Sequence, residues 1–510
     1  MKTIFTRWFQ NSKRRIERRL DKTKGPVVGM QPVLSARNIQ YEVAERTHAI
    51  TCGGIGTFHL LARKLGLIDA IDKRLHLLQI HMPYHESDHV LNFAYNALCG
   101  GHCMQDMELR RTDENFLNAL GARRTPDPTT AGDFCRRFEE DDVKTLLAVI
   151  DEVRQGVWAQ QPDSFFDCAT IDADGTTVET TGQCKEGADF AYNGVWGYHP
   201  LVVSLANTGE ILSIVNRPGN RPSHENAAAE LTRASRLCLL AGFRKILMRG
   251  DTDFSQTKHL DGWNANPRVR FIFGYDATAN LVKLAEELPE STWQRLVRPE
   301  RYQVQTQPRS RPENVKDRIV RERKYEKLVL ESEDVGEFDY QPTACRQSYR
   351  MVVIRKNIRK EKGEKVLGHE IRYFFYITND RELPADKIVF SANDRCNQEN
   401  LIAQLKGGVR ALRTPVNTLA SNWAYMVMTA LGWNLKAWWA LSLPESPGRW
   451  QERHREEKQW VLRLEFRTFL NAFVLLPCQI IRAGRKLIYR LLGWNPHLSI
   501  FFRVVNALRC

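Results

Sequence analysis

The residues Phe-Phe-Asp-Cys-Ala-Thr-Ile-Asp-Ala-Asp-Gly-Thr-Thr-Val, at positions 165–178, have the character of a β-strand. Asp172 and Asp174 are two positions apart, so both carboxylates project from the same face of that strand. Two apolar runs follow, at Tyr198–Leu205 and Ile211–Val215. They are joined by Asn207-Thr208-Gly209, which predicts a β-hairpin.

Beyond the hairpin, the chain alternates between helical and strand patterns. We expect a helix over Glu225–Leu240 closed by Gly242, a strand over Lys245–Met248 ending at Arg249-Gly250-Asp251, a helix over Ser255–Asn264 and a strand over Val269–Gly274. The order β-β-β-α-β-α-β predicts a mixed sheet covered by helices, which is an α/β fold.

The regions on either side of this segment differ from it in apolar periodicity and in composition. Apolar residues recur at helical spacing over 55–150, and Thr125-Pro126-Asp127-Pro128-Thr129-Thr130 is a break that precedes a further helix. Residues 285–385 are rich in Arg, Lys and Glu, with strand-like pieces at Lys327–Leu330, Tyr349–Ile354 and Ile371–Ile377. We expect helices to resume at Cys396–Lys406 and to continue to the end of the chain.

The positive charge is concentrated at the two ends of the 510 residues. The formal net charge is +14; residues 1–40 hold ten Lys and Arg against two acids, and residues 400–510 hold sixteen against five. The region between them is slightly acidic. This pattern favours a polyanion such as nucleic acid bound at both ends of the chain, and the alternative is basic tails that only aid solubility.

Other bulk features argue against several protein classes. The eleven cysteines include no CxxC pair, so we expect reduced thiols and no disulfide framework. Residues 1–24 lack the apolar core of a secretory signal. The apolar stretches Trp423–Leu443 and Phe469–Ile481 are interrupted or short, so we expect buried helices and no membrane contact. The expected location is the cytoplasm, in association with the nucleoid.

Three acidic positions fall where the predicted sheet would bring them together. Asp174 lies on the first strand, and Asp251 ends the strand that follows the long helix, where α/β folds place ligands. Glu399 lies on a helix whose 100° turn per residue puts Arg395 and Lys406 on the same face. The alternative is a solvated face with an i,i+4 Arg–Glu pair.

Carboxylates without histidine or cysteine suit Mg²⁺ or Mn²⁺. Two such ions about 3.5–4 Å apart can activate water or a 3′-hydroxyl and stabilise the leaving oxygen of a phosphodiester.

At these residues the chain resembles the DDE-type transposases of bacterial insertion sequences, in the cut-and-paste group with a β-rich insertion in a ribonuclease H-like core. The resemblance covers roughly residues 40–490. It is carried by Asp-Gly-Thr at 174–176, Gly-Tyr-His-Pro-Leu at 197–201, Arg-Gly-Asp-Thr-Asp-Phe at 249–254 and the Arg-x3-Glu-x6-Lys helix at 395–406.

The resemblance implies roles for several of these residues. Asp174, Asp251 and Glu399 would be the catalytic, metal-binding triad, holding two Mg²⁺ or Mn²⁺ ions. Arg395 and Lys406 would contact DNA phosphates. The implied partners are the inverted-repeat ends of the element and target DNA, bound by a homodimer.

The sequence departs from the family pattern at two positions. Ala392 stands where a Tyr is common, and Asp253 stands where a Gly is common. Asp253 is therefore a rival of Asp251, just as Asp172 is a rival of Asp174, and we assign Asp172 and Asp253 to positions beside the metal ligands.

We therefore expect six regions along the chain. They are a basic flexible arm (1–40), a helical DNA-binding domain (41–150), the first part of the ribonuclease H-like catalytic core (160–284), a β-rich insertion (285–390), the last part of the core (391–440) and a basic helical C-terminal region (441–510).

Three other clusters have less specific interpretations. His81, His85 and His89, with His102 nearby, could hold zinc, but Pro83 interrupts them and no standard ligand spacing is met. The expected place of Trp433, Trp438 and Trp439 is the core. Residues 52–56, Cys-Gly-Gly-Ile-Gly, have no strand leading into them and are expected to form a turn.

Two alternatives to a transposase stay open from the sequence. One is a metal-dependent nuclease on the same fold, which cuts DNA and never joins it. The other is a domesticated DNA-binding protein without catalytic activity.

Overall fold

The computed structural model describes residues 48–298, 315–363, 365–484 and 486–509, together with Gln10, Asn11, Arg14, Arg15 and Arg18. The basic arm expected over residues 1–40 lies, apart from those five residues, outside the described part of the chain.

Helices form the first layer of the molecule, as the sequence predicts. They are α2 (Ile55–Lys64), α3 (Leu67–Arg74), α4 (Glu86–Leu98), α5 (Met107–Arg111), α6 (Glu114–Leu120), α7 (Pro128–Cys135) and α8 (Glu140–Trp158). The break at 125–130 contains the cap of α7, because the Asp127 side chain accepts hydrogen bonds from the backbone N–H groups of Thr129 and Thr130. The Cys-Gly-Gly run at 52–54 is a turn before α2, as expected.

A nine-stranded mixed sheet runs through the middle of the molecule in the order β10-β11-β12-β13-β9-β8-β2-β6-β7. Its strands are β2 (Cys168–Gly175), β6 (Leu201–Leu205), β7 (Glu210–Val215), β8 (Lys245–Gly250), β9 (Val269–Tyr275), β10 (Gln294–Arg295), β11 (Glu326–Tyr340), β12 (Tyr349–Lys362) and β13 (Lys365–Thr378). Strands β2, β8 and β9 are parallel neighbours, whereas β6 and β7 form the predicted antiparallel hairpin. The predicted α/β class is confirmed at this level.

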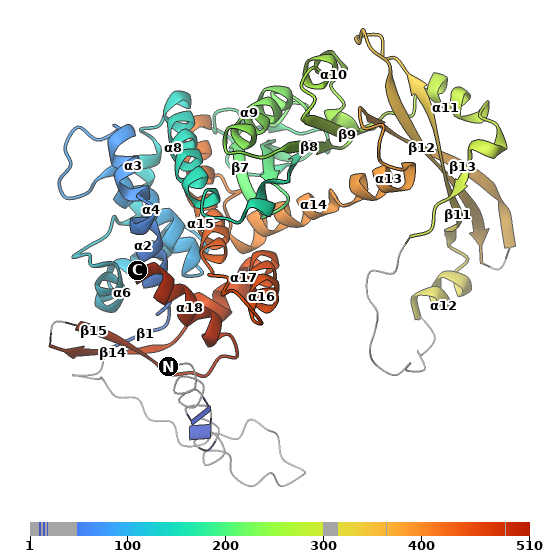
Figure 1. Cartoon of the computed structure of the whole chain (residues 1–510). Coiled ribbons are helices and arrows are strands. Elements are labelled where there is room, and N and C mark those ends of the chain that lie inside the picture. The colour runs from blue at the N-terminus through green and yellow to red at the C-terminus, as the bar shows by residue number, and fades with distance from the viewer. Residues whose placement is uncertain are drawn as a thin grey trace.

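Helices cover both faces of the sheet (Figure 1). Helices α9 (Ala227–Leu240) and α10 (Thr257–Asn264) lie on one face, and α13 (Ala385–Asn393) and α14 (Cys396–Ala403) lie on the other. The last two helices lead the chain back from β13 to the core.

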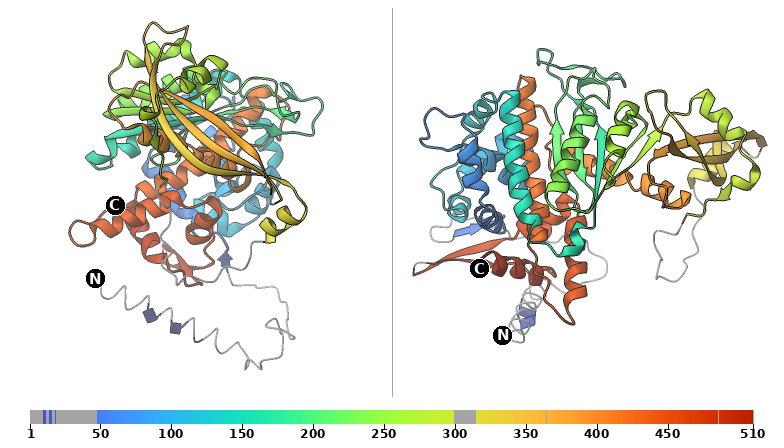
Figure 2. Two further views of the ribbon diagram at one scale, coloured as in Figure 1. Left: turned by 90° about the vertical axis from the view of Figure 1, so that its right-hand side faces the viewer. Right: turned by 45° about the horizontal axis from the view of Figure 1, so that its top comes forward.

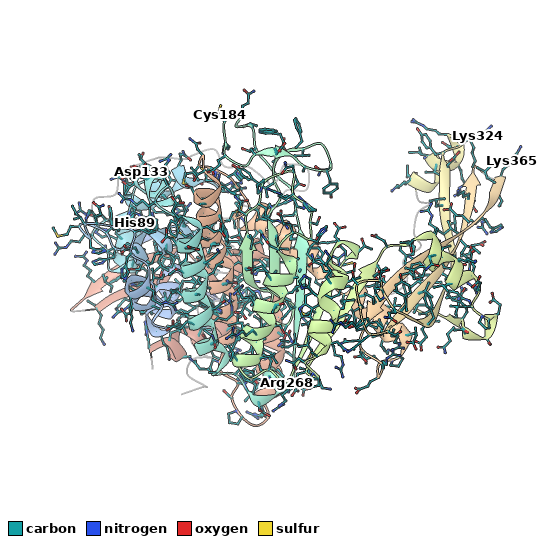
Figure 3. All side chains as sticks on the ribbon, turned by 90° about the horizontal axis from the view of Figure 1, so that it is seen from above. His89, Asp133, Cys184, Arg268, Lys324 and Lys365 are labelled. Atoms are coloured by element: carbon teal, nitrogen blue, oxygen red, sulfur yellow. The ribbon has the colours of Figure 1, made fainter. Side chains whose placement is uncertain are left out.

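The region expected as a β-rich insertion is β-rich, and it extends the central sheet. Strand β13 pairs antiparallel with β9, from Phe375 opposite Tyr275 to Thr378 opposite Ile272. Helices α11 (Ala279–Glu286) and α12 (Val315–Glu322) accompany these strands. Figure 3 shows the far end, marked by Lys324 and Lys365, on the opposite side of the molecule from His89 in α4.

A late helix, α15 (Leu419–Leu441), lies between the N-terminal helices and the sheet (Figure 2). It contacts α4, α8 and β7 and is buried from Ser421 to Leu441. Its two polar interruptions are satisfied: the Asn434 amide pairs with the backbone of Ile211, and the Lys436 ammonium donates to the Leu462 carbonyl. The predicted buried helix and the core position of Trp433, Trp438 and Trp439 are confirmed. No helix in the described ranges is long and apolar enough to cross a membrane.

The prediction that helices continue to the C-terminus is wrong over 478–491. Helices α16 (Gln451–Arg463), α17 (Phe466–Phe469) and α18 (Leu498–Arg509) are present, but β14 (Cys478–Ala483) and β15 (Lys486–Leu491) form a hairpin that also pairs with β1 (His48–Ile50). The preceding helical segment ends at Val474, and Pro477, which has no N–H to donate, keeps the helix from resuming. Gly484 takes a left-handed conformation at the turn, with φ of 59°. Phe469–Ile481 is therefore part helix and part strand.

Candidate active site

The first two predicted acids lie at one edge of the sheet because their strands are parallel neighbours. Asp174 is near the C-terminal end of β2, and Asp251 directly follows β8. The Asp251 side chain accepts a hydrogen bond of 3.0 Å from the backbone N–H of Asp253 in the following turn. Asp253 itself is exposed.

Asp172 is bound by an arginine of the neighbouring strand. Its carboxylate receives two hydrogen bonds from Arg249, of 2.7 and 2.8 Å, and only 1% of its side chain is exposed. Burial raises the pKa of Asp172, and the hydrogen bonds from Arg249 oppose that rise. Arg249 also donates to the Ser391 carbonyl at 2.7 Å, so this ion pair joins β2, β8 and α13.

Helix α14 brings the third acid to the same edge. Arg395 precedes the helix, with its guanidinium 3.2 Å from the Asp174 carboxylate and 3.9 Å from the Glu399 carboxylate. The i,i+4 pair considered from the sequence therefore forms, and Arg395 also reaches across to β2. The Glu399 side chain is 62% exposed, whereas that of Asp174 is 15% exposed.

A buried glutamine fixes α14 on the sheet. The Gln398 amide accepts a hydrogen bond from the Ser204 hydroxyl and donates one of 3.0 Å to the Val202 carbonyl, both in β6. Because Glu399 is the next residue, this anchor sets where the third acid lies. The sequence analysis did not predict a role for Gln398. Its position directly before Glu399 was the one feature of the sequence that could have indicated this role.

The three carboxylates influence one another. Burial raises the pKa of Asp174 to about 6; Arg395 opposes this, and the charges of Asp251 and Glu399 add to it. Burial also raises the pKa of Asp251, against the effect of Arg395. The sequence-predicted triad is therefore gathered around one guanidinium.

The three carboxylates form an all-oxygen set of potential metal ligands. Carboxylate oxygens are the ligands that Mg²⁺ and Mn²⁺ prefer, and Asp174, Asp251 and Glu399 offer three carboxylates with no soft ligand among them. Within the described residues, no three acidic, histidine or cysteine side chains form a ready metal cluster. The positive charge among these acids is that of Arg395, and their oxygen donors are of the kind that a hard divalent ion prefers.

The predicted lysine also lies at this edge. Lys406 is in the π-helical turn Gln404–Gly408 after α14, and its ammonium donates to the Thr177 carbonyl at 2.8 Å. Burial lowers the pKa of Lys406, and the nearby charge of Asp174 opposes that effect. Arg395, Glu399 and Lys406 all lie near the Asp174 carboxylate, but Lys406 lies beyond α14 in a π-helical turn and not on the single α-helical face that was predicted.

A second group of buried side chains lies behind Gly175, the residue after Asp174. A Cβ atom on Gly175 would lie 2.8 Å from the His199 Nε2, 3.2 Å from the Ser223 Cβ and 3.3 Å from an Arg217 nitrogen. Glycine in the Asp-Gly-Thr segment is thus required by close approach. Burial lowers the pKa of His199 to about 4 and that of Arg217 to about 10.

No function was predicted from the sequence for the side chains of this second group. His199 is the central residue of Gly-Tyr-His-Pro-Leu, so its motif was visible without its function. Arg217 had no signal at all: it binds the carbonyls of His199, Ser223 and Glu225, which only the fold brings within reach.

The side chains of the histidines considered for zinc do not all contact the same neighbours. His81 lies 3.3 Å from the Glu86 carboxylate and stacks on His85. His89 stacks on Phe134, with 4.3 Å between the ring centroids.

The model of the family described as "Transposase DDE domain group 1" matches residues 33–508, which include every site residue above. No curated protein matches the chain. One matching solved structure is "Cryo-EM structure of piggyBac transposase synaptic complex with hairpin DNA"; it has 11% sequence identity and a TM-score of 0.36, and the match covers 84% of this chain and 85% of that chain.

Proposed function

The chain belongs to the family Transposase DDE domain group 1, of DNA-cleaving and strand-transferring enzymes, and we propose that this transposase acts on the ends of a bacterial insertion sequence. The observation that carries the proposal is the meeting of three acids from distant segments, Asp174, Asp251 and Glu399, at the C-terminal edge of parallel strands. Water would attack the phosphorus at the element's end and displace the 3′-oxygen of one strand, and this freed 3′-hydroxyl would attack a phosphorus of target DNA and displace a 3′-oxygen of the target strand.

We assign metal binding to Asp174, Asp251 and Glu399. Two bound Mg²⁺ or Mn²⁺ ions would supply the positive charge that activates the nucleophile and stabilises the leaving oxygen. Arg395 then leaves the carboxylates and donates to a DNA phosphate, to which its planar guanidinium is matched. Lys406, held by the Thr177 carbonyl, binds a second phosphate.

Several coarser features support further parts of the proposal. The strand order β7-β6-β2-β8-β9, with a hairpin beside parallel strands, supports a ribonuclease H-like core that β10–β13 extend. We propose that the chain has the six regions predicted from the sequence, and that the helices of 41–150 form a DNA-binding domain. Two copies of the protein would form a homodimer that binds the two DNA ends. This homodimer would act at the nucleoid.

The assignment is tested with a DNA fragment carrying the short inverted repeats that border the gene. We expect Asp251→Ala and Glu399→Ala each to abolish cleavage and to leave DNA-end binding largely intact, because a lost metal ligand removes catalysis before affinity. Asp253→Ala, which removes the rival acid and leaves its backbone N–H on Asp251, should keep measurable cleavage. Near-normal cleavage by either triad variant would remove that residue from the site.

The choice between the two acids of β2 has its own test. Asp174→Asn should lose activity in Mg²⁺ and in Mn²⁺, because a neutral amide is a poor ligand for a hard ion. Asp172→Asn should keep measurable cleavage, reduced about 10–100-fold, as is typical of changes around the ligands. The reverse ranking would assign the metal to Asp172.

A precut DNA end separates the transposase from a nuclease on the same fold. We expect the wild-type enzyme to join such an end to a target plasmid. Cleavage without joining would identify a nuclease, and DNA binding without cleavage would identify an inactive DNA-binding protein.

A further inference from the structure

A groove begins at the residue that follows the first acid. It has a volume of about 1130 Å³ and starts at Gly175. One wall is the threonine-rich segment 176–181, another is formed by Tyr192 and Asn193, and a third by Lys406 and residues 412–415. Residues 103–105 of the N-terminal helical layer complete it. The groove is thus continuous with the site of Asp174.

The lining of this groove is suited to phosphate groups. Its cations are Lys185, Lys406 and Arg413, and its acid is Glu179. Lys185 and Lys406 donate to the backbone carbonyls of Thr414 and Thr177, which leaves further N–H donors on each ammonium. Within the described residues none of the three cations forms an ion pair with a carboxylate. Threonine hydroxyls at 176, 177, 180 and 181 add neutral donors of the kind that contact DNA backbones.

An exposed aromatic ring stands at the edge of the groove. The Tyr192 side chain is 85% exposed, on the loop between β4 (Asp189–Phe190) and β5 (Trp196–Tyr198). Its ring meets the buried His199 edge to face, with 5.9 Å between the centroids and 79° between the planes. Gly182 and Lys185, which flank Cys184 in the sequence, line the groove. The loop that carries Cys184 projects from the body of the molecule in Figure 3.

Hydrogen bonds hold the loop that carries Tyr192, between β4 and β5, against the residues that follow β2. His199 lies 3.3 Å from the Thr177 hydroxyl and 3.3 Å from that of Ser223. The neighbour of Tyr192, Asn193, donates to the same Thr177 hydroxyl at 3.4 Å. The ring therefore has a defined place next to the cations, with most of its surface open to a ligand.

We propose that this groove binds an unpaired DNA strand beside the bond to be cut, with a base stacked on Tyr192. The Lys and Arg side chains and the threonine hydroxyls bind the phosphates, and the face of one base stacks on the tyrosine ring. Inside a duplex both faces of each base are covered by neighbouring pairs, so a ring can stack only on a base that has left the helix or ends it. The inference rests on the proposed function, and it predicts that the DNA end opens before cleavage.

Binding is tested with a short single-stranded oligonucleotide that carries one 2-aminopurine, whose fluorescence falls on stacking. Wild type and Tyr192→Trp should quench the base. Tyr192→Ala should lose the quenching and weaken binding about 10-fold, as is typical when one base–aromatic stack is removed. Tyr325→Ala, which removes an exposed tyrosine of the insertion, is the matched control and should behave as wild type. Equal quenching by Tyr192→Ala would overturn the proposal.

Cleavage gives a second and independent test on element ends that are either fully paired or mismatched next to the cut. Tyr192→Ala should cut the paired end about 10-fold more slowly than wild type and should regain the wild-type rate on the mismatched end, because the mismatches open the DNA in its place. Equal slowing on both ends would refute a role in holding an unpaired base. Failure of the wild type to cut either end would instead count against the proposed function.

Discussion

The buried charges near the site differ in how they are neutralised. Asp172 has two hydrogen bonds from Arg249, whereas Asp174 shares Arg395 with Glu399. Removing one partner of a buried ion pair typically costs about 3–5 kcal/mol, because the other charge is left without compensation. Asp172 therefore neutralises the Arg249 that donates to Ser391 in α13, and we propose Asp174 as the acid of β2 that acts in catalysis.

A methyl group on Gly175 should damage the site. Because its Cβ would lie 2.8 Å from His199 Nε2, we expect Gly175→Ala to displace the end of β2 and to lower the free energy of unfolding by about 1–3 kcal/mol. Cleavage should fall by at least the same factor as the fraction of folded protein. Denaturant titration and the cleavage assay measure the two effects.

Gly156 provides the matched control for this substitution. It lies in α8 with no atom within 4 Å of a built Cβ, so Gly156→Ala should raise the free energy of unfolding by about 0.5–1 kcal/mol. A Gly175→Ala protein as stable and as active as wild type would show that the end of β2 can accommodate a methyl group without displacement.

His89 should make stability depend on pH. Burial lowers its pKa from 6.5 to about 4, so between these values the unfolded chain binds more protons than the folded one. The wild-type free energy of unfolding, compared with that of His89→Leu, should therefore rise by about 2–3 kcal/mol as pH increases from 4 to 6.5. Urea titrations of both proteins across this range measure the difference. A difference independent of pH would contradict the lowered pKa.

At the scale of elements, α14 illustrates how a catalytic helix is positioned. Its exposed side carries Glu399, and its buried side carries Gln398, which binds β6. Arg249 fixes the preceding helix α13 through Ser391. The strand pairing, the ion pair and the buried amide together determine how far Glu399 lies from Asp174.

Loss of the Gln398 amide should affect catalysis more than DNA binding. Gln398→Ala leaves the Ser204 hydroxyl without its partner, and we expect a loss of about 1–3 kcal/mol in the free energy of unfolding. The maximal cleavage rate should fall about 10–100-fold with a smaller change in affinity for DNA ends, because Glu399 moves and the basic groups stay. Asn397→Ala, at an exposed position of the same helix, is the control. A cleavage rate equal to that of the control would exclude a positioning role.

The elements differed in how far the sequence could predict them. Local patterns were sufficient for the hairpin at 207–209 and the buried helix around Trp438, whereas the predicted break at 125–130 runs into α7, which begins at Pro128. The strands at 478–491 were missed, because an apolar run after Pro477 has no periodicity that separates strand from helix. Gln398 and Arg217 bind groups that are distant in the sequence, and such partners cannot be found without the fold.

Across the whole molecule, one sheet connects the site to the insertion. Strand β13 pairs with β9, and β9 with β8, which ends at Asp251. The β-rich region therefore continues the catalytic sheet, and α13 and α14 return from it to deliver Glu399 (Figure 1). The sequence predicted the strands of this region but not their pairing with the core, since register depends on long-range contacts.

The basic ends of the chain should make DNA binding sensitive to salt. Each neutralised phosphate contributes about −0.9 to the slope of log K against log salt concentration. Residues 1–24 contain nine of the ten basic residues within 1–40, so their deletion should flatten this slope. Binding titrations at several salt concentrations measure it for both proteins. An unchanged slope would make the segment a passive tail.

The central place of α15 has a consequence for how the protein is made. This helix fills the space between α4, α8 and the sheet, yet ribosomes add it about 15–60 s after α4, at ordinary elongation rates. Until then the faces of α4 and α8 that pack on α15 lack their partner. A chain that ends before residue 441 leaves these apolar faces open to water, and we expect it to be less stable than the whole protein.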